Sequence, residues 1–86
     1  MAVSCELRGA PAVPGMARDI GIGGIFIESN EALPFGTEVV VVGRLPGSHI
    51  DLRLPGVVRW AKPDGFGVQF GLLGARETHA ISALPR

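Results

Sequence analysis

The sequence predicts an all-β domain that closes into a small barrel and ends in one helix. Thirteen glycines and seven prolines punctuate the 86 residues and leave short apolar segments between turns, a pattern typical of all-β domains. Several of these segments are rich in valine or alternate apolar and polar residues. Because closure removes exposed sheet edges, we expect a six-stranded, mainly antiparallel β-barrel, with residues 1–86 forming a single domain.

The N-terminal part is predicted to contain two strands separated by loops. Val3–Arg8 is predicted as the first strand, whereas Gly9–Gly15 contains two prolines and is predicted as a loop. Gly21–Gly24 is predicted as a glycine-rich turn, and Ile25–Glu28 follows as a strand. The polar segment Ser29–Gly36 is expected to be a loop that ends in a turn.

The central part contains the clearest strand of the sequence. Thr37–Arg44 carries four β-branched valines in a run too short for a helix. Pro46-Gly47 is predicted as a turn. Ile50–Leu54 alternates apolar and charged residues, so one face is expected to be buried and the other wet. Pro55-Gly56 is expected to bend this strand, and Val57–Ala61 to continue it.

The last part is predicted to form a hairpin strand and a helix. Pro63-Asp64-Gly65 is a turn signal, because proline fixes one backbone dihedral angle and glycine permits a positive one. Phe66, Val68 and Phe70 then share one face of a strand. Apolar residues at near-helical spacing predict a helix over Gly74–Leu84.

The predicted core combines the apolar residues of these strands. It contains Phe26 or its neighbours Ile25 and Ile27, together with Val40, Val42, Leu52, Val58, Trp60, Val68 and Phe70.

The charge balance argues against nucleic-acid binding and membrane attraction. Eight basic residues balance eight acidic ones, with no basic run. The basic residues are mostly arginine, and Lys62 is the only lysine. No segment has the length of a membrane span or the pattern of a signal peptide. Cys5 is the only cysteine, so it is expected to be a buried residue of the first strand rather than half of an internal disulfide. We expect a cytoplasmic protein, or a domain cut from one.

The residues show no catalytic or metal-binding constellation. His49 and His79 stand far apart in the sequence and are expected at the surface, and no His/Cys/Asp group has zinc spacing. Gly21-Ile22-Gly23-Gly24 invites comparison with dinucleotide-binding loops, but Phe26 occupies the position of the third glycine and a strand follows instead of a helix. We therefore expect a tight turn at these glycines and no enzymatic activity.

Several segments, taken in order, resemble the PilZ domain, a small bacterial β-barrel that serves as a cyclic di-GMP receptor. Asp19-Ile20-Gly21-Ile22-Gly23-Gly24 resembles the family motif Asp-x-Ser-x-x-Gly, which precedes a strand like Ile25-Phe26-Ile27. The other matching segments are Leu33–Thr37, Gly56–Trp60 and Gly65–Phe70. The resemblance covers about residues 19–84. It implies that Asp19, Gly21 and Gly24 would contact the nucleotide.

Two departures from the family pattern affect the implied site. Gly21 replaces the motif's serine, so a hydroxyl donor is absent. Members that bind cyclic di-GMP also carry an Arg-x-x-x-Arg motif before the barrel, whereas only Arg8 and Arg18 precede Asp19 here. A hydrogen bond to a charged group contributes roughly 1.5–3 kcal/mol. Losing two arginine contacts would therefore cost roughly 3–6 kcal/mol, or about a hundred- to ten-thousand-fold in affinity.

Three hypotheses about function follow from the resemblance. The first is a PilZ-like adaptor of the cyclic di-GMP system that binds the nucleotide weakly or not at all and contacts a bacterial signalling, motility or regulatory protein. The second is a true receptor whose arginines come from elsewhere, for example from Arg8, Arg18 or another chain. The third is a structural β-module of a larger protein. No cofactor is expected, apart from cyclic di-GMP as a possible ligand.

Overall fold

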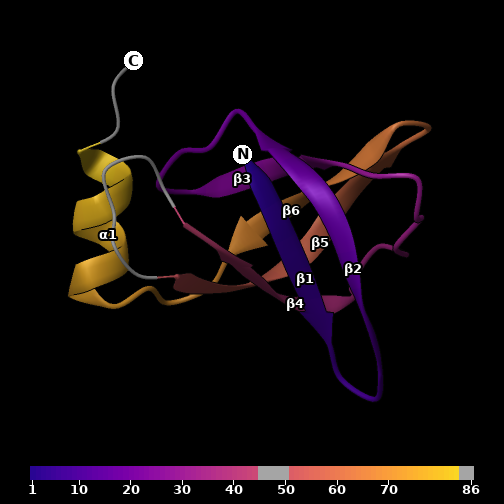
Figure 1. The fold of residues 1–86 in the computed structure, drawn as a ribbon, viewed down its shortest axis with the longest axis horizontal. Helices are drawn as coiled ribbons and strands as arrows, with labels where there is room; N and C mark the ends of the chain where they lie inside the picture. The colour runs from indigo at the N-terminus through magenta and orange to yellow at the C-terminus, as the bar shows by residue number, and fades with distance from the viewer. Residues whose placement is uncertain (45–50, 84–86) are drawn as a thin grey trace.

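The computed structural model describes residues 1–44 and 51–83, which form a closed β-barrel with one short helix (Figure 1). The elements are β1 (Ala2–Leu7), β2 (Ala10–Arg18), β3 (Gly24–Glu28), β4 (Glu38–Gly43), β5 (Leu52–Lys62), β6 (Gly65–Phe70) and α1 (Ala75–Ser82). This architecture confirms the predicted fold class.

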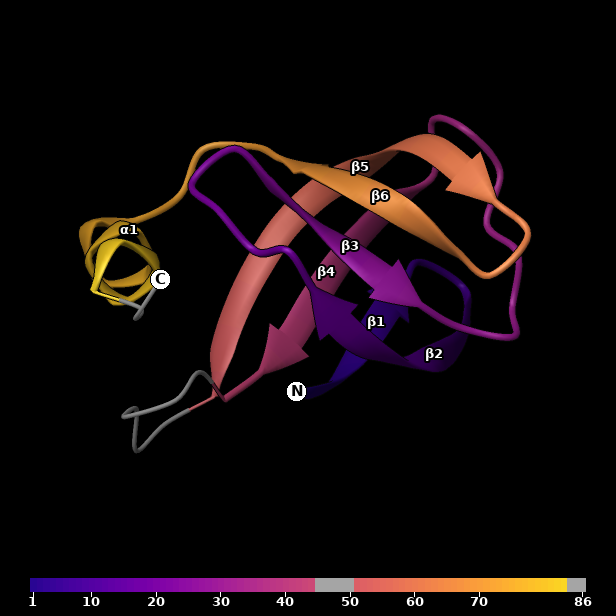
Figure 2. The ribbon, with the colours of Figure 1, turned by 90° about the horizontal axis from the view of Figure 1, so that it is seen from above.

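Every strand of the barrel pairs antiparallel with both of its neighbours, in the closed order β1-β2-β3-β6-β5-β4. Counted around this ring, β3 and β4 are three strands apart in both directions, so they lie on opposite walls of the barrel. Helix α1 lies outside the strands, at one end of the barrel (Figure 2). Its Ile81 is buried against the core.

Side chains from all six strands fill the interior of the barrel. The largest fully buried ones are Phe66, Ile25, Ile27, Leu52, Leu54, Val41, Val58, Val68 and Cys5. The structure thus confirms the predicted burial of Leu52, Val58 and Val68. On β3, Ile25 and Ile27 point inward and Phe26 is only half-buried, which decides between the alternatives that the sequence left open.

The prediction that Val40 and Val42 belong to the core is wrong. Val39 and Val41 are buried instead, while Val40 and Val42 are half-buried on the outer wall. Four consecutive valines carry no alternation that could indicate the inward pair. The register indicates it, because Val41 lies opposite Cys5 of β1 on one side and Leu54 of β5 on the other.

The prediction of Trp60 as a core residue is also wrong, since Trp60 is 46% exposed. The register of β5 against β6 shifts between Val58 and Trp60. A bulge of this kind changes which face later side chains occupy. Val58 therefore points inward and Trp60 outward, although they are two residues apart. Phe70 is half-buried and packs against the edge of the core.

The loop predicted at Gly9–Gly15 is largely strand, because β2 begins at Ala10. Proline cannot donate a backbone hydrogen bond and is therefore confined to places where a strand lacks a neighbour. Pro11 and Pro14 lie where β2 has no neighbour on its β3 side, because β2 pairs with β3 only from Met16 onward, although Pro14 lies opposite Ser4 of β1 on the other side. Gly9, at a positive φ of 74°, forms the tight turn between β1 and β2 instead.

The remaining boundaries of strands and turns lie close to those predicted from the sequence. β5 continues through Pro55 and Gly56 as one long, curved strand (Figure 2). Residues 63–64 form the predicted hairpin turn. Helix α1 is shorter than Gly74–Leu84, and its His79 is exposed. Some of the predicted features lie outside the described residues. They are the turn at Pro46-Gly47, His49, the start of the strand at Ile50 and the end of the helix at Leu84.

Candidate functional site

A row of outward residues crosses the wall formed by β2, β3, β6 and β5. Arg18 of β2 lies opposite Phe26 of β3. Gly67 of β6 lies opposite Phe26 on one side and Trp60 of β5 on the other. Because glycine has no side chain, Gly67 leaves space on the outward face of β6 that a neighbouring side chain can occupy.

The space at Gly67 is occupied by the Trp60 indole. A β-carbon at Gly67 would overlap the indole ring, so the ring lies directly on the backbone of β6. One row further along, Lys62 lies opposite Gly65, and its Nζ reaches to 5.5 Å from the centre of the Phe26 ring. This distance is that of a cation–π contact. The exposed Trp60 indole, the half-buried Phe26 ring and the Lys62 ammonium group therefore lie on one outward face of the barrel.

The turn between β2 and β3 borders this surface. Asp19 adopts a positive φ of 50°, and it is the one residue besides glycine that does so in the described part of the chain. Aspartate tolerates this region better than most residues. The turn is closed by a hydrogen bond of 2.9 Å from the Gly21 N–H to the Gly24 carbonyl. Gly24 needs to be glycine, because a β-carbon there would overlap the Val68 carbonyl.

These residues line an open groove of about 530 Å³, which we call the Asp19 groove. The lining of the groove includes three carboxylates and two cationic side chains. Its charged residues are Arg18, Asp19, Glu28, Lys62 and Asp64. Arg18 Nε lies 2.8 Å from Glu28 Oε1, so the arginine is already paired. Carboxylates thus outnumber cationic side chains in the groove.

The structure brings together the three residues that the resemblance implied and one of the two arginines considered as replacements for the missing motif. Arg18, Asp19, Gly21 and Gly24 all line the Asp19 groove. Arg8 instead lies next to the β1–β2 turn and lines a different groove. The nine residues of β2 separate that turn from Arg18, which at about 3.3 Å per residue corresponds to roughly 25–30 Å.

The sequence reasoning missed the three side chains that form the surface of this groove. The sequence placed Trp60 in the core, left open whether Phe26 or its neighbours Ile25 and Ile27 belong there, and singled out Lys62 only as the single lysine. Gly65-Phe66-Gly67 holds a usable signal, because glycines at alternate positions leave one face of a strand without side chains. Aromatic residues on the neighbouring strands then have room to lie on that face.

The fold and this groove define a small β-barrel module whose candidate binding surface lies beside the β2–β3 turn. The profile of the PilZ domain family matches residues 1–84. The chain belongs to the PilZ domain family, a family of non-catalytic cyclic di-GMP-binding domains, and is thereby a domain of the cyclic di-GMP signalling type. Comparison with curated proteins gave no match, and comparison with solved structures gave none.

Two further findings concern other classes of function. Among the described residues, no group of three or more His, Cys, Asp or Glu side chains is arranged to hold a metal ion. The one helix in the described ranges has eight residues, too few to cross a membrane.

Proposed function

We propose that this chain is a signalling adaptor of the cyclic di-GMP system that acts through protein contacts and binds the nucleotide weakly or not at all. The observation that carries this proposal is the charge of the Asp19 groove. Cyclic di-GMP brings two phosphates, each with a negative charge. The groove contains three carboxylates and two cationic side chains. One of the cationic side chains, Arg18, is paired with Glu28. Like charges in such a groove oppose binding.

The geometry at position 21 supports the same conclusion. Gly21 has no hydroxyl to donate, and a β-carbon placed there would meet no atom within 4 Å. The site therefore has room for the family's serine but lacks its donor. Each missing hydrogen bond to a charged group removes roughly 1.5–3 kcal/mol of binding free energy. We expect the chain to act in the cytoplasm on a bacterial signalling, motility or regulatory protein.

Calorimetric titration of residues 1–86 with cyclic di-GMP tests the proposal. We expect a dissociation constant above about 100 µM, since each missing contact weakens binding by about tenfold or more. Low-micromolar binding that Asp19→Ala abolishes would contradict the adaptor function. Asp51→Ala is the matched control, because Asp51 is an exposed aspartate that lies outside the Asp19 groove.

One observation favours the second candidate function, a receptor whose arginines are supplied from elsewhere. The exposed Trp60 ring and the half-buried Phe26 ring, with Lys62 beside Phe26, resemble a surface on which a planar base stacks and a phosphate is neutralised. What such a site still lacks is the pair of arginines and the serine hydroxyl.

A gain-of-function variant distinguishes the two functions. The Ala17 N–H donates a 2.8 Å hydrogen bond to the Met1 carbonyl, so the first residue lies beside β2, two residues from Asp19. We expect Gly21→Ser combined with an added N-terminal Arg-x-x-x-Arg segment to raise the affinity about a hundredfold or more. Failure of this variant, with the barrel intact, would show that the wall itself rejects the nucleotide and would exclude the receptor function.

A further inference from the structure

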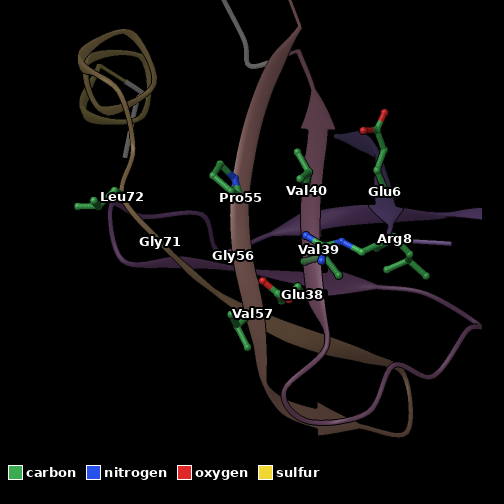
Figure 3. A pocket seen from close by; sticks show the side chains of 11 residues that line it. Glu6, Arg8, Glu38, Val39, Val40, Pro55, Gly56, Val57, Gly71 and Leu72 are labelled. Atoms are coloured by element: carbon green, nitrogen blue, oxygen red, sulfur yellow. The ribbon is translucent and has the colours of Figure 1, made fainter. Parts of the chain in front are cut away.

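A second groove lies on the wall formed by β1, β4 and β5, away from the Asp19 groove (Figure 3). It has a volume of about 490 Å³, and we call it the Leu72 groove. Its floor is apolar: Val40 of β4 lies opposite Pro55 of β5, and Val57 follows two residues later. No described residue of this group contributes to the Asp19 groove.

Leu72 forms a projecting apolar side chain beside this floor. The Gly71 N–H donates a 2.9 Å hydrogen bond to the Pro55 carbonyl, which fixes the segment after β6 against β5. Leu72 is then 98% exposed, and Figure 3 shows it beyond β5, pointing away from the barrel. A single exposed leucine is common at protein surfaces. Here it adjoins an apolar groove that residues 1–44 and 51–83 leave open.

The rim of the Leu72 groove carries charges of both signs. Glu6 is engaged by Arg53, whose Nη2 lies 2.6 Å from Glu6 Oε1, and this hydrogen bond lowers the pKa of Glu6. Arg8, in the turn that follows β1, and Glu38, at the start of β4, also line the groove. Neither makes an ion pair with another residue in the described ranges. One available cation and one available anion therefore sit on the same rim.

We propose that the occupant of the Leu72 groove is a second copy of this chain, related to the first by a twofold axis. In a twofold interface the same patch meets itself, so each contact occurs twice. A projecting leucine beside an apolar groove and a rim with both charges satisfy this requirement. Leu72 of each copy enters the groove of the other, and Arg8 of each copy faces Glu38 of the other.

The architecture also specifies the kind of contact and its strength. A closed barrel offers no free strand edge, so the copies meet through side chains rather than by extending a sheet. The groove is small, and interfaces below about 1,200 Å² of total buried surface are weak or transient. We expect a dissociation constant of about 10–500 µM.

Sedimentation velocity of residues 1–86 between about 5 and 1,000 µM, a range spanning the expected dissociation constant, tests this proposal. We expect a monomer–dimer equilibrium that Leu72→Asp weakens about tenfold or more and that Leu72→Met preserves. Ile22→Asp is the matched control, because Ile22 is an exposed apolar residue of the β2–β3 turn. Circular dichroism melting curves show whether each variant is folded.

A charge exchange tests the orientation of the two copies. Arg8→Glu and Glu38→Arg should each weaken the dimer, and the double variant should restore it. A wild type that stays monomeric throughout the concentration range would overturn the proposal and leave the groove to a different protein. A dimer insensitive to Leu72→Asp would also overturn it, because the contact would then lie on another face.

Discussion

The Asp19 groove and the Leu72 groove lie on two different parts of the barrel wall, both of which include β5, and they are built in different ways. In the first, Gly67 of β6 has no side chain, so the Trp60 indole lies directly on its backbone, and Phe26 lies opposite Gly67 on the other side. In the second, valines and a proline form the floor, and the segment carrying Leu72 raises one border. The first surface is aromatic and charged, whereas the second is aliphatic with charges only at its rim.

This difference shows that the outward residues can vary in chemistry separately from the inward residues that form the core. Both walls place the same kinds of aliphatic side chains in the shared core. The outward residues are free of that constraint, because exposed substitutions change stability little. One small barrel can therefore present two chemically different surfaces. The experiments below ask whether the two surfaces depend on a common core and whether they can be changed independently.

The largest effect is expected from Phe66→Ala, which should abolish both surfaces together. Phe66 is fully buried in the centre of the barrel, and truncating a buried phenylalanine typically costs about 3–5 kcal/mol of unfolding free energy. That is a large part of the total stability of a small domain. Phe35→Ala is the control, since Phe35 is exposed and should melt close to the wild type. Chemical denaturation measures both.

The next largest effect on stability is expected from Cys5, a buried residue of β1 that lies opposite Val41 of β4. Burial raises the pKa of its thiol from 9.0 to about 11. The unfolded chain therefore loses this proton first, so stability should fall as the pH rises from about 9 toward about 11. At 1.36 kcal/mol per pKa unit the loss is at most about 2–3 kcal/mol. Denaturation curves at pH 8 and pH 10.5 measure it, and Cys5→Ala should lack this part of the pH dependence.

A smaller, local effect is expected from Gly67→Ala, which should change the Asp19 groove alone. The new methyl group would overlap the Trp60 indole and displace it, at a cost of about 1–3 kcal/mol for overpacking. Trp60 is the only tryptophan, so its fluorescence emission reports the displacement directly. Gly21→Ala, which meets no neighbouring atom, is the control. Loss of self-association in Gly67→Ala would show that the two walls are coupled.

The smallest effect is expected from Glu28→Gln, which removes the partner of Arg18. An exposed ion pair contributes only about 0–1 kcal/mol to stability, so the melting temperature should hardly change. The Asp19 groove loses one carboxylate and gains an unpaired guanidinium. We expect a modest gain in affinity for cyclic di-GMP and unchanged self-association. A calorimetric signal as weak as that of the wild type would show that charge is not what limits nucleotide binding.

The sequence was sufficient for the fold and for the β2–β3 turn. Clusters of glycine and proline indicated the turns at residues 21–24 and 63–64, but the glycines there have no positive φ. A β-carbon at Gly24 or Gly65 would instead overlap the backbone of the neighbouring strand. The same reasoning failed at Pro11 and Pro14, because a proline interrupts a strand only where its missing N–H would have had a partner. Whether that partner exists is a property of the neighbouring strand and not of the proline.

The amino-acid sequence by itself determined the class of fold, the helix at the end, and the turn that carries Asp19, since these depend on local periodicity and backbone preference. Tertiary structure decided which valines of β4 face inward, because four identical neighbours acquire a direction only from Cys5 and Leu54 on the adjoining strands. It also decided that Trp60 faces outward, since a bulge changes the face without changing the composition. Both candidate surfaces result from such cross-strand relations, and residues far apart in the sequence meet there only once the barrel closes.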